Sequence, residues 1–398
     1  MAAKARHLVH ALLVATATFL AGCTSPYSTP QFYPQQPVVG VRQLLESHGE
    51  VDIITIHGMC THDGKWAHEA INALAEQLGD KSRPKIEPFK LPDTDALIYK
   101  RQLDLDGKRV NISAIVWSPI LTDMKKGLCY DQKHKTGLCA EGEEHPDFLE
   151  KPIESPKFEE SRAKINGGLK DSILDDCLAD AMAYQGAARG EISKQVQEAI
   201  LVAAVPGNEH LHTLAEKKEK AEQRKTPLVV FTSSLGSKVG FDAIKALRDP
   251  NHPKDAALAT IERTKTIFMA ANQIPILQLA DMTLKSSAEV NTLVAAPPKD
   301  SLAQLLEDYQ AAVRHEQQEL HLREVPAKLP TVVVLSDPND VLSYSLRNSP
   351  RRPEYPFVDV VVSNDWTWFG LLESPLSAHR EYLVQPQIAD LVMNGYTP

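Results

Sequence analysis

The chain has 398 residues, of which 43% are hydrophobic and 24% are charged, an ordinary globular composition that suits one large domain with insertions or two modest domains. Its formal net charge of −9 argues against non-specific nucleic-acid binding, which needs a basic surface. No zinc-finger spacing or RNA-binding aromatic motif is present. The composition therefore favours a folded protein and excludes nucleic acid as an expected partner.

The first residues combine a basic start with a short apolar run. Lys4 and Arg6 precede the apolar stretch from Leu8 to Phe19, which is shorter than the ~20 residues of a comfortable membrane span. Leu20-Ala21-Gly22-Cys23 follows at once, and the whole segment resembles the signal peptide and lipobox of bacterial lipoproteins. The resemblance implies cleavage before Cys23, diacylation of its sulfur and acylation of the new amino terminus. A short transmembrane anchor is the alternative.

The lipobox resemblance also implies a location and a domain division. Thr24 stands where an aspartate would favour the inner membrane, so we expect export and lipid anchoring to the bacterial cell envelope, at the outer membrane and facing the periplasm. Residues 1–22 are then the signal peptide. Residues 23–40, rich in proline, serine and glutamine, predict a semi-extended tether. Residues 41–398 form the folded domain.

Four further cysteines remain after the lipobox. In an oxidising compartment they predict two disulfides, and the sequence leaves three pairings open. Cys129 and Cys139 lie close together in a loop, which favours that pair and leaves Cys60 with Cys177. No basic or histidine neighbour marks any of them as a catalytic thiol.

From Val51 onward, apolar β-branched runs alternate with amphipathic stretches. Such alternation predicts an α/β protein with a mostly parallel central sheet and helices on both faces. The expected strands are Val51–Ile56, Val110–Trp117, Leu228–Phe231, Thr266–Ala270, Thr331–Leu335 and Phe357–Val362. The expected helices are Trp66–Leu78, Ile173–Tyr184, Ile192–Val205, Lys238–Leu247, Leu302–Leu322 and Gln385–Met393.

Two stretches do not fit a minimal doubly wound domain and are predicted insertions. The first covers about residues 120–166 and is charged and turn-rich; a surface loop without substrate contact is an equal reading of it. The second covers about residues 272–298 and follows a strand whose end should face the ligand edge of the sheet. We expect the second to act as a lid.

Residues 227–242 run an apolar strand into a small-residue corner and then into a helix. This arrangement presents a nucleophilic serine, because the sharp turn exposes the hydroxyl and the helix N-terminus supplies positive potential. We assign the nucleophile to Ser234. The corner reads Thr232-x-Ser234-x-Gly236, in which a threonine replaces the first glycine of the usual Gly-x-Ser-x-Gly pattern.

The acid and the base of such a site follow the serine along the chain. The strand Thr331–Leu335 ends in Ser336-Asp-Pro-Asn-Asp340, which offers two carboxylates; we assign Asp340 to the triad and Asp337 to the turn, and the alternative assignment stays open. His379, expected on a loop between the last strand and the last helix, is the predicted general base. Ser234, Asp340 and His379 thus stand in the required order.

An oxyanion produced by attack on a carbonyl needs backbone N–H donors. The first strand ends in His57-Gly58-Met59, where a glycine lets the backbone approach closely, and we assign the donors to the amides of Met59 and Leu235. His57 precedes the serine and is expected to hold the loop through hydrogen bonds. No histidine spacing fits a zinc protease, so we assign no metal.

Together these motifs resemble the α/β-hydrolase superfamily, in particular its lipase- and esterase-like bacterial members, from about Val51 to the C-terminus. A further match is the Asp180-x-x-x-Tyr184 helix with Arg189-Gly190-Glu191-Ile192 after it, which looks like a segment found before the elbow in uncharacterised serine esterases. The resemblance implies an acyl-enzyme on Ser234, proton transfer by His379, orientation by Asp340 and no cofactor.

The resulting hypothesis is a membrane-tethered serine hydrolase that acts on carboxylic esters, either lipids or soluble esters. The rival hypothesis is a catalytically silent lipoprotein that uses the same scaffold to bind a ligand or an envelope partner. An amidase or peptidase is a third reading, because the triad does not distinguish esters from amides. The oligomeric state does not follow from the sequence.

Overall fold

The structure is a computed structural model of the chain. It describes residues 23–24, 29–151, 161–252, 254–282, 299–323, 325–347, 349, 353–368, 373–380 and 382–398. The predicted signal peptide, residues 1–22, therefore lies outside the described residues.

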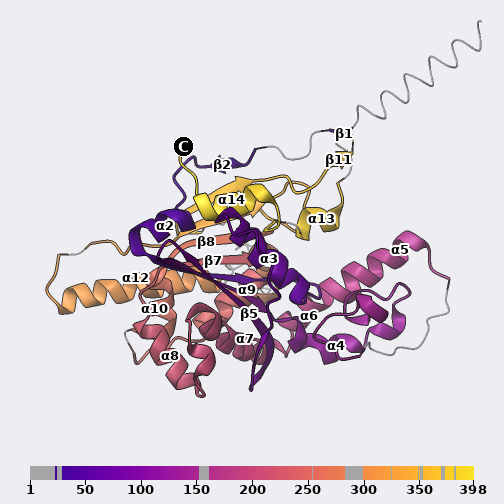
Figure 1. Cartoon of the computed structure of the whole chain (residues 1–398), viewed down its shortest axis with the longest axis horizontal. Helices are drawn as coiled ribbons and strands as arrows, with labels where there is room; N and C mark the ends of the chain where they lie inside the picture. The colour runs from indigo at the N-terminus through magenta and orange to yellow at the C-terminus, as the bar shows by residue number, and fades with distance from the viewer. Residues whose placement is uncertain are drawn as a thin grey trace, which may run out of the picture.

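A nine-stranded mixed sheet forms the centre of the molecule (Figure 1). Six consecutive strands, β10-β9-β8-β7-β3-β6, run parallel, while β5 and β2 are antiparallel to their neighbours. In spatial order the strands are β2 (Gln31–Tyr33), β10 (Phe357–Val361), β9 (Thr331–Ser336), β8 (Thr264–Ala270), β7 (Leu228–Ser233), β3 (Glu50–Ile56), β6 (Lys108–Val116), β5 (Thr94–Leu105) and β4 (Phe89–Leu91). The predicted α/β class is confirmed, and each of the six predicted strands is present.

Helices cover both faces of the sheet. One face carries α2 (Val41–His48), α3 (Gly64–Gln77) and α14 (Pro386–Asn394), and the other carries α7 (Arg189–Ala204), α8 (Leu214–Gln223), α9 (Leu235–Lys245), α10 (Ala256–Arg263) and α12 (Ser301–Glu319). Successive residues of β3 serve the two cores, because side chains of a strand alternate between faces. Ile53 belongs to the cluster that contains Ile71 of α3, and Ile54 belongs to the cluster that contains Val239 of α9.

The first predicted insertion is built from short helical turns at one end of the molecule, on the right of Figure 1. It contains α4 (Thr122–Lys126) and several 3₁₀ turns, stapled by the disulfide Cys129–Cys139. It leads into one continuous helix made of α5 (Lys164–Leu169), the π-helical η5 (Lys170–Leu178) and α6 (Ala179–Gln185).

The second predicted insertion begins with α11 (Ile274–Leu277) and the turn η7 (Gln278–Asp281). Residues 283–298 lie outside the described residues, so the expected lid role stays a prediction.

The predicted tether differs in the structure. Gln31–Tyr33 form β2 at the edge of the sheet, and Val38 is buried and pairs with Tyr396. The ring of Phe32 stacks on that of Tyr396, with their centroids 3.6 Å apart. The tether was predicted from its many prolines, and the prediction did not consider that its apolar residues can pack against the central sheet and the C-terminal segment. The folded part therefore starts before residue 41.

A two-residue strand, β1 (Cys23–Thr24), pairs with β11 (Thr367–Trp368). Cys23 lies opposite Trp368, in the segment between β10 and the short helix α13 (Pro375–Arg380). Within the described ranges, no helix is both long and apolar enough to cross a lipid bilayer.

Candidate active site

Ser234 stands at the corner between β7 and α9. Its backbone adopts φ 53° and ψ −128°, a left-handed conformation that is strained for a side-chain-bearing residue. The Ser234 N–H donates to the carbonyl of Ala270 in β8 at 2.7 Å, and the Ser234 carbonyl accepts from the Ser237 N–H at 3.1 Å. These bonds hold the serine at the strand-to-helix turn that the sequence predicted.

Two glycines make this corner possible. A Cβ on Gly236 would lie 2.2 Å from the carbonyl oxygen of His57, so only glycine lets α9 approach the loop after β3. A Cβ on Gly58 would lie 2.7 Å from the Cβ of Ser234. The backbone at Gly58 therefore passes directly beside the serine side chain.

The structure brings the three predicted triad residues together. The Ser234 hydroxyl lies 3.0 Å from Nε2 of His379, and Nδ1 of His379 lies 2.9 Å and 3.1 Å from the two carboxylate oxygens of Asp340. Since the carboxylate accepts from Nδ1–H, Nε2 is free to accept the serine proton. All three side chains are buried.

The two aspartates after β9 have different partners. Asp340 accepts from His379, from the Leu342 N–H and from the hydroxyl of Tyr382. Asp337 accepts from the backbone N–H groups of Asn339 and Asn364. Asp340 is thus the carboxylate that contacts the histidine, and Asp337 organises the turn.

Tyr382 was not singled out from the sequence, although it follows His379 by only three positions. Its hydroxyl donates to Asp340 at 3.1 Å and accepts from the Asp337 N–H at 2.8 Å. Its position three residues after the predicted base could have marked it as a candidate site residue. Tyr382 therefore links the carboxylate of Asp340 to the backbone of Asp337.

His379 lies on the short helix α13, whereas the sequence predicted a loop. Pro375 is its first residue, which suits proline because the first helical N–H has no partner within the helix. The Asn364 side-chain amide donates to the Ala378 carbonyl at 2.7 Å and ties this helix to the segment after β10. The histidine is therefore held by regular secondary structure.

His57 is fully buried and holds the loop, in line with its expected role. Its Nδ1–H donates to the Gly58 carbonyl at 2.7 Å, and its Nε2 accepts from the Trp117 N–H at 2.9 Å. The Trp117 indole N–H returns a bond of 2.9 Å to the His57 carbonyl. Burial holds the pKa of His57 well below its ordinary value, so this imidazole is neutral.

The predicted oxyanion donors, Met59 and Leu235, flank the serine. Leu235 is the first residue of α9, and Met59 follows Gly58. Within the described part of the chain, neither backbone N–H has a hydrogen-bond acceptor. Both residues are buried, Met59 being 6% exposed and Leu235 0%, and the oxyanion role of their amides stays a prediction.

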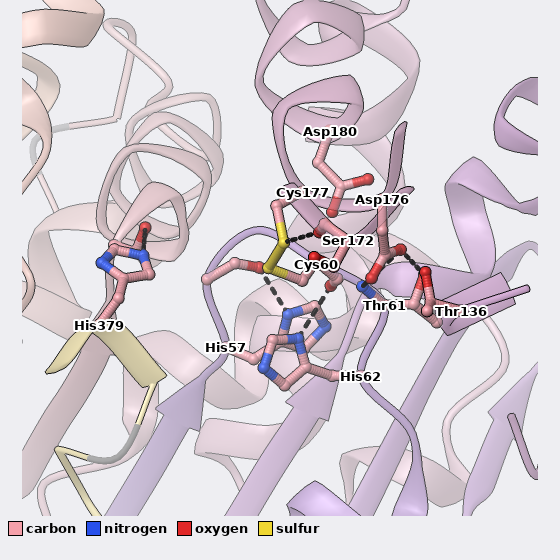
Figure 2. The surroundings of a disulfide bond; sticks show 12 residues. His57, Cys60, Thr61, His62, Thr136, Ser172, Asp176, Cys177, Asp180 and His379 are labelled. Carbon is pink, nitrogen blue, oxygen red and sulfur yellow. Dashed lines mark hydrogen bonds between the residues drawn. A yellow bond between two sulfur atoms is a disulfide. The ribbon is translucent and has the colours of Figure 1, made fainter. Parts of the chain in front are cut away.

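The loop that carries Met59 is fastened to the η5 helix. Cys60 forms a disulfide with Cys177, and Figure 2 shows Asp176 and Cys177 pointing from the helix toward the loop. Asp176 accepts from the Thr61 hydroxyl at 2.6 Å and from the Thr61 N–H at 3.2 Å. Both disulfides that the sequence favoured, Cys60–Cys177 and Cys129–Cys139, are present in the structure.

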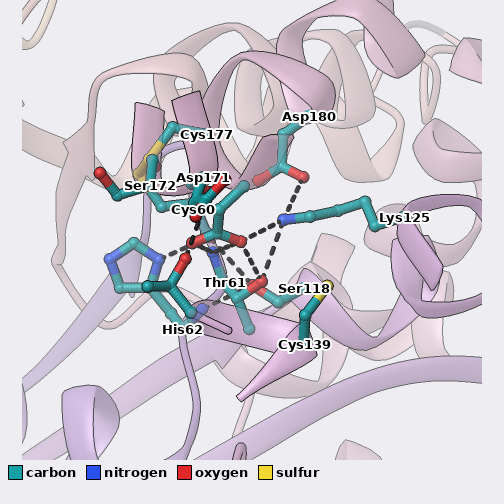
Figure 3. A network of polar contacts seen from close by, with 12 residues as sticks. Cys60, Thr61, His62, Ser118, Lys125, Cys139, Asp171, Ser172, Cys177 and Asp180 are labelled. Atoms are coloured by element: carbon teal, nitrogen blue, oxygen red, sulfur yellow. Dashed lines mark hydrogen bonds and ion pairs between the residues drawn. A yellow bond between two sulfur atoms is a disulfide. The ribbon is translucent and has the colours of Figure 1, made fainter. Parts of the chain in front are cut away.

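Lys125 lies between two carboxylates of this helix, and Figure 3 shows its contact with Asp180. Its ammonium lies 2.8 Å from Asp176 and 2.9 Å from Asp180. Burial raises the pKa of Asp180 to about 6 against the attraction of Lys125. Burial also opposes ionisation of Asp176, but Lys125 and Thr61 hold its pKa below the ordinary value.

A second network joins α6 to the elbow helix α9. The Tyr184 hydroxyl and the Arg189 guanidinium both donate to Asp242 at 2.8 Å, and Arg189 also pairs with Asp281. Tyr184 and Arg189 belong to the segment that resembled serine esterases. Their role in the structure is to position α6 against the elbow.

Among the described residues, no group of three or more His, Cys, Asp or Glu side chains is placed to hold a metal ion. Comparison of the chain with protein-family models gives no match, and comparison with curated proteins gives none either. The functional interpretation therefore depends on the geometry of the site.

Proposed function

We propose that the protein is a serine hydrolase of the α/β-hydrolase fold that cleaves carboxylic esters. One observation carries this proposal: the chain of contacts from Ser234 through His379 to Asp340, with the serine at a strained turn between a strand and a helix. The order of the three residues along the chain is that of the fold, and the six parallel strands that end beside them support the same assignment.

The proposed reaction uses each part of the site in turn. His379 takes the proton of Ser234 as its oxygen attacks the ester carbonyl, and Asp340 stabilises the imidazolium that forms. The N–H groups of Met59 and Leu235 donate hydrogen bonds to the carbonyl oxygen as it becomes negatively charged. His379 then returns the proton to the leaving alcohol, and water releases the acid from Ser234 by the reverse sequence.

The test uses the chain without residues 1–22, which retains every described residue. A fluorophosphonate should label Ser234, and short and long nitrophenyl esters should be hydrolysed. Ser234→Ala should abolish both, because it removes the attacking oxygen. Equal hydrolysis by the parent and by Ser234→Ala would contradict the proposal.

The rival role, a silent scaffold that binds a ligand or an envelope partner, is an outcome of the same experiment. It is favoured by the burial of Ser234, which is only 2% exposed. A parent protein that stays unlabelled while folded would support it.

We further propose that Cys23 carries lipid and anchors the protein to the outer membrane, facing the periplasm. The lipobox supports this proposal. Labelled palmitate should be incorporated into the full chain, and Cys23→Ala should prevent it. Incorporation that persists in Cys23→Ala would contradict the anchor.

A further inference from the structure

The continuous helix α5–η5–α6 has one acidic face and one largely apolar face, and the acidic face is the buried one. Its four aspartates face the body and are at most 9% exposed: Asp171, Asp175, Asp176 and Asp180. Five of its large apolar side chains are 42% to 76% exposed, namely Ile165, Leu169, Leu174, Leu178 and Met182, whereas Tyr184 near its C-terminal end is buried. A surface helix of a soluble protein ordinarily buries its apolar residues and exposes its charges.

The exposed residues form a single stripe along this helix. They follow one another at intervals of four residues, except between Leu169 and Leu174, where the interval is five. That longer step occurs where the π-helical segment η5 begins, and a π-helix repeats at i+5. The π segment therefore keeps Ile165 and Leu169 on the same face as the residues that follow.

The acidic face of this helix is firmly attached to the rest of the protein, so the helix is not a core helix that has come loose. Asp171 accepts from the backbone N–H groups of Lys133 and His134 at 3.0 Å and 2.8 Å. Farther along the helix, the disulfide to Cys60 fixes it to the loop beside the triad (Figure 2). Ion pairs also join it to Lys125 of α4 (Figure 3). The apolar face of the helix is therefore the one exposed to solvent.

Single exposed apolar side chains scattered over a surface are normal in soluble proteins. Several in one continuous row indicate an interaction site. A helix with such a face can lie in the interface of a lipid bilayer with its apolar side toward the acyl chains. The start of the described chain identifies the occupant. Cys23, the lipobox cysteine, lies in β1 opposite Trp368 of β11, just ahead of the helix that carries His379.

In Figure 1, β1, β11, α13 and α5 all lie in the right half of the molecule, with β1 and β11 above and α5 lower at the far right, whereas α12 extends to the left. We infer that the stripe Ile165, Leu169, Leu174, Leu178 and Met182 is a membrane-docking surface that rests on the lipid surface and turns the triad edge of the sheet toward it. The ester substrate is then met at the bilayer. The choice of a bilayer as the occupant rests on the proposed lipid anchor at Cys23, and the last step rests in addition on the proposed hydrolase activity.

The test is co-flotation with vesicles of phosphatidylethanolamine and phosphatidylglycerol. It uses the chain 23–398 without attached lipid, so that only the protein surface can bind. The combined variant Leu174→Gln, Leu178→Gln, Met182→Gln should lower the partition coefficient at least tenfold. The matched control changes three equally exposed side chains near the end of α12, Leu320→Gln, Leu322→Gln and Val325→Gln, and should bind as the parent does.

Equal binding by the parent and the stripe variant, or equal loss in both variants, would overturn the inference. So would a parent that is dimeric in solution and becomes monomeric only in the stripe variant, because the stripe would then join two copies. Circular dichroism and the melting temperature verify that both variants fold.

Two further measurements separate this inference from the proposed function. The stripe variant should hydrolyse a water-soluble ester at the parental rate, and it should lose activity at least tenfold on the same ester carried in vesicles. Ser234→Ala should float with vesicles as the parent does. Vesicle binding without any fluorophosphonate labelling would contradict the hydrolase and leave the docking surface supported.

Discussion

At the scale of single residues, the site is held by partners that the family pattern does not specify. Thr232, which replaces the first glycine of the Gly-x-Ser-x-Gly pattern, and Ser237, which follows Gly236, are both fully buried. Their hydroxyl oxygens lie 2.8 Å apart, and the Thr232 hydroxyl also contacts the Phe268 carbonyl at 3.3 Å. The hydroxyl that Thr232 introduces thus has its partner in Ser237 beneath the elbow.

This pairing predicts non-additive stability. Thr232→Val removes one hydroxyl and leaves the other without its partner, which should cost about 1–3 kcal/mol of the free energy of unfolding. Ser237→Ala alone should also destabilise, while the double variant should be less destabilised than the sum of the two. Urea unfolding of the four proteins measures this coupling, and simple additivity would contradict the pairing.

The carboxylates after β9 give a second prediction at this scale. Asp340→Asn should lower kcat by about 10⁴-fold, because the amide favours the wrong tautomer of His379. Asp337→Asn is the matched control, since that side chain contacts backbone N–H groups and not the histidine. It should chiefly lower stability. Steady-state ester hydrolysis compares the two, and a larger loss in Asp337→Asn would reverse the assignment.

At the scale of elements, the loop after β9 meets the segment before α13 through Glu373. This buried carboxyl accepts from the Asn339 side chain at 2.6 Å. Burial and the nearby Asp337 carboxylate raise its pKa from 4.5 to about 7. The folded protein therefore holds a proton on Glu373 at pH values where the unfolded chain has lost it.

The sign of the resulting pH dependence follows from linkage. Because the folded state binds the extra proton, the contribution of Glu373 to stability is complete below about pH 4.5 and is lost as the pH rises to about 7. Glu373→Gln should flatten the unfolding free energy across this window, whereas the exposed Glu141→Gln should not. Urea titrations at several pH values measure it. A Glu373→Gln protein with the parental slope would contradict the raised pKa of Glu373.

Sequence reasoning located the elements that have strong apolar runs and missed those without them. The hairpin of β5 and β6 was overlooked because Lys100, Arg101 and Gln102 interrupt the apolar pattern of β5. Its turn carried a readable signal, since Asp106 and Gly107 both adopt positive φ, as a tight two-residue hairpin turn requires.

The candidate site was accessible to sequence reasoning because a serine at a strand-to-helix corner is followed, in the pattern of such sites, by the acid and then the base, as Ser234 is followed by Asp340 and His379. The burial of the aspartates in the helix α5–η5–α6 was not accessible in this way. Asp176 and Asp180 are buried only because Lys125, Thr61 and Cys60 lie against them, and the sequence does not show that these distant residues meet. Tertiary contacts of this kind override the usual rule that charges face water.

At the scale of the whole molecule, the two disulfides constrain the unfolded chain to different extents. Cys60–Cys177 spans 117 residues, and Cys129–Cys139 spans 10. Loop-closure entropy then predicts that removing the long bridge costs about 5 kcal/mol of unfolding free energy and removing the short one about 3 kcal/mol.

Removing the two disulfides should have effects on activity that differ more than their effects on stability. Cys60 directly follows Met59, so its bond to the η5 helix fixes the backbone that carries an oxyanion donor, whereas Cys129–Cys139 closes a local loop of the insertion. Cys60→Ala with Cys177→Ala should therefore slow fluorophosphonate labelling of Ser234 even at low temperature, where the variant is folded. Cys129→Ala with Cys139→Ala is the matched control and should be labelled at the parental rate. Equal labelling of both variants would mean that the ion pairs of Asp176 and Asp180 hold the loop without the covalent bond.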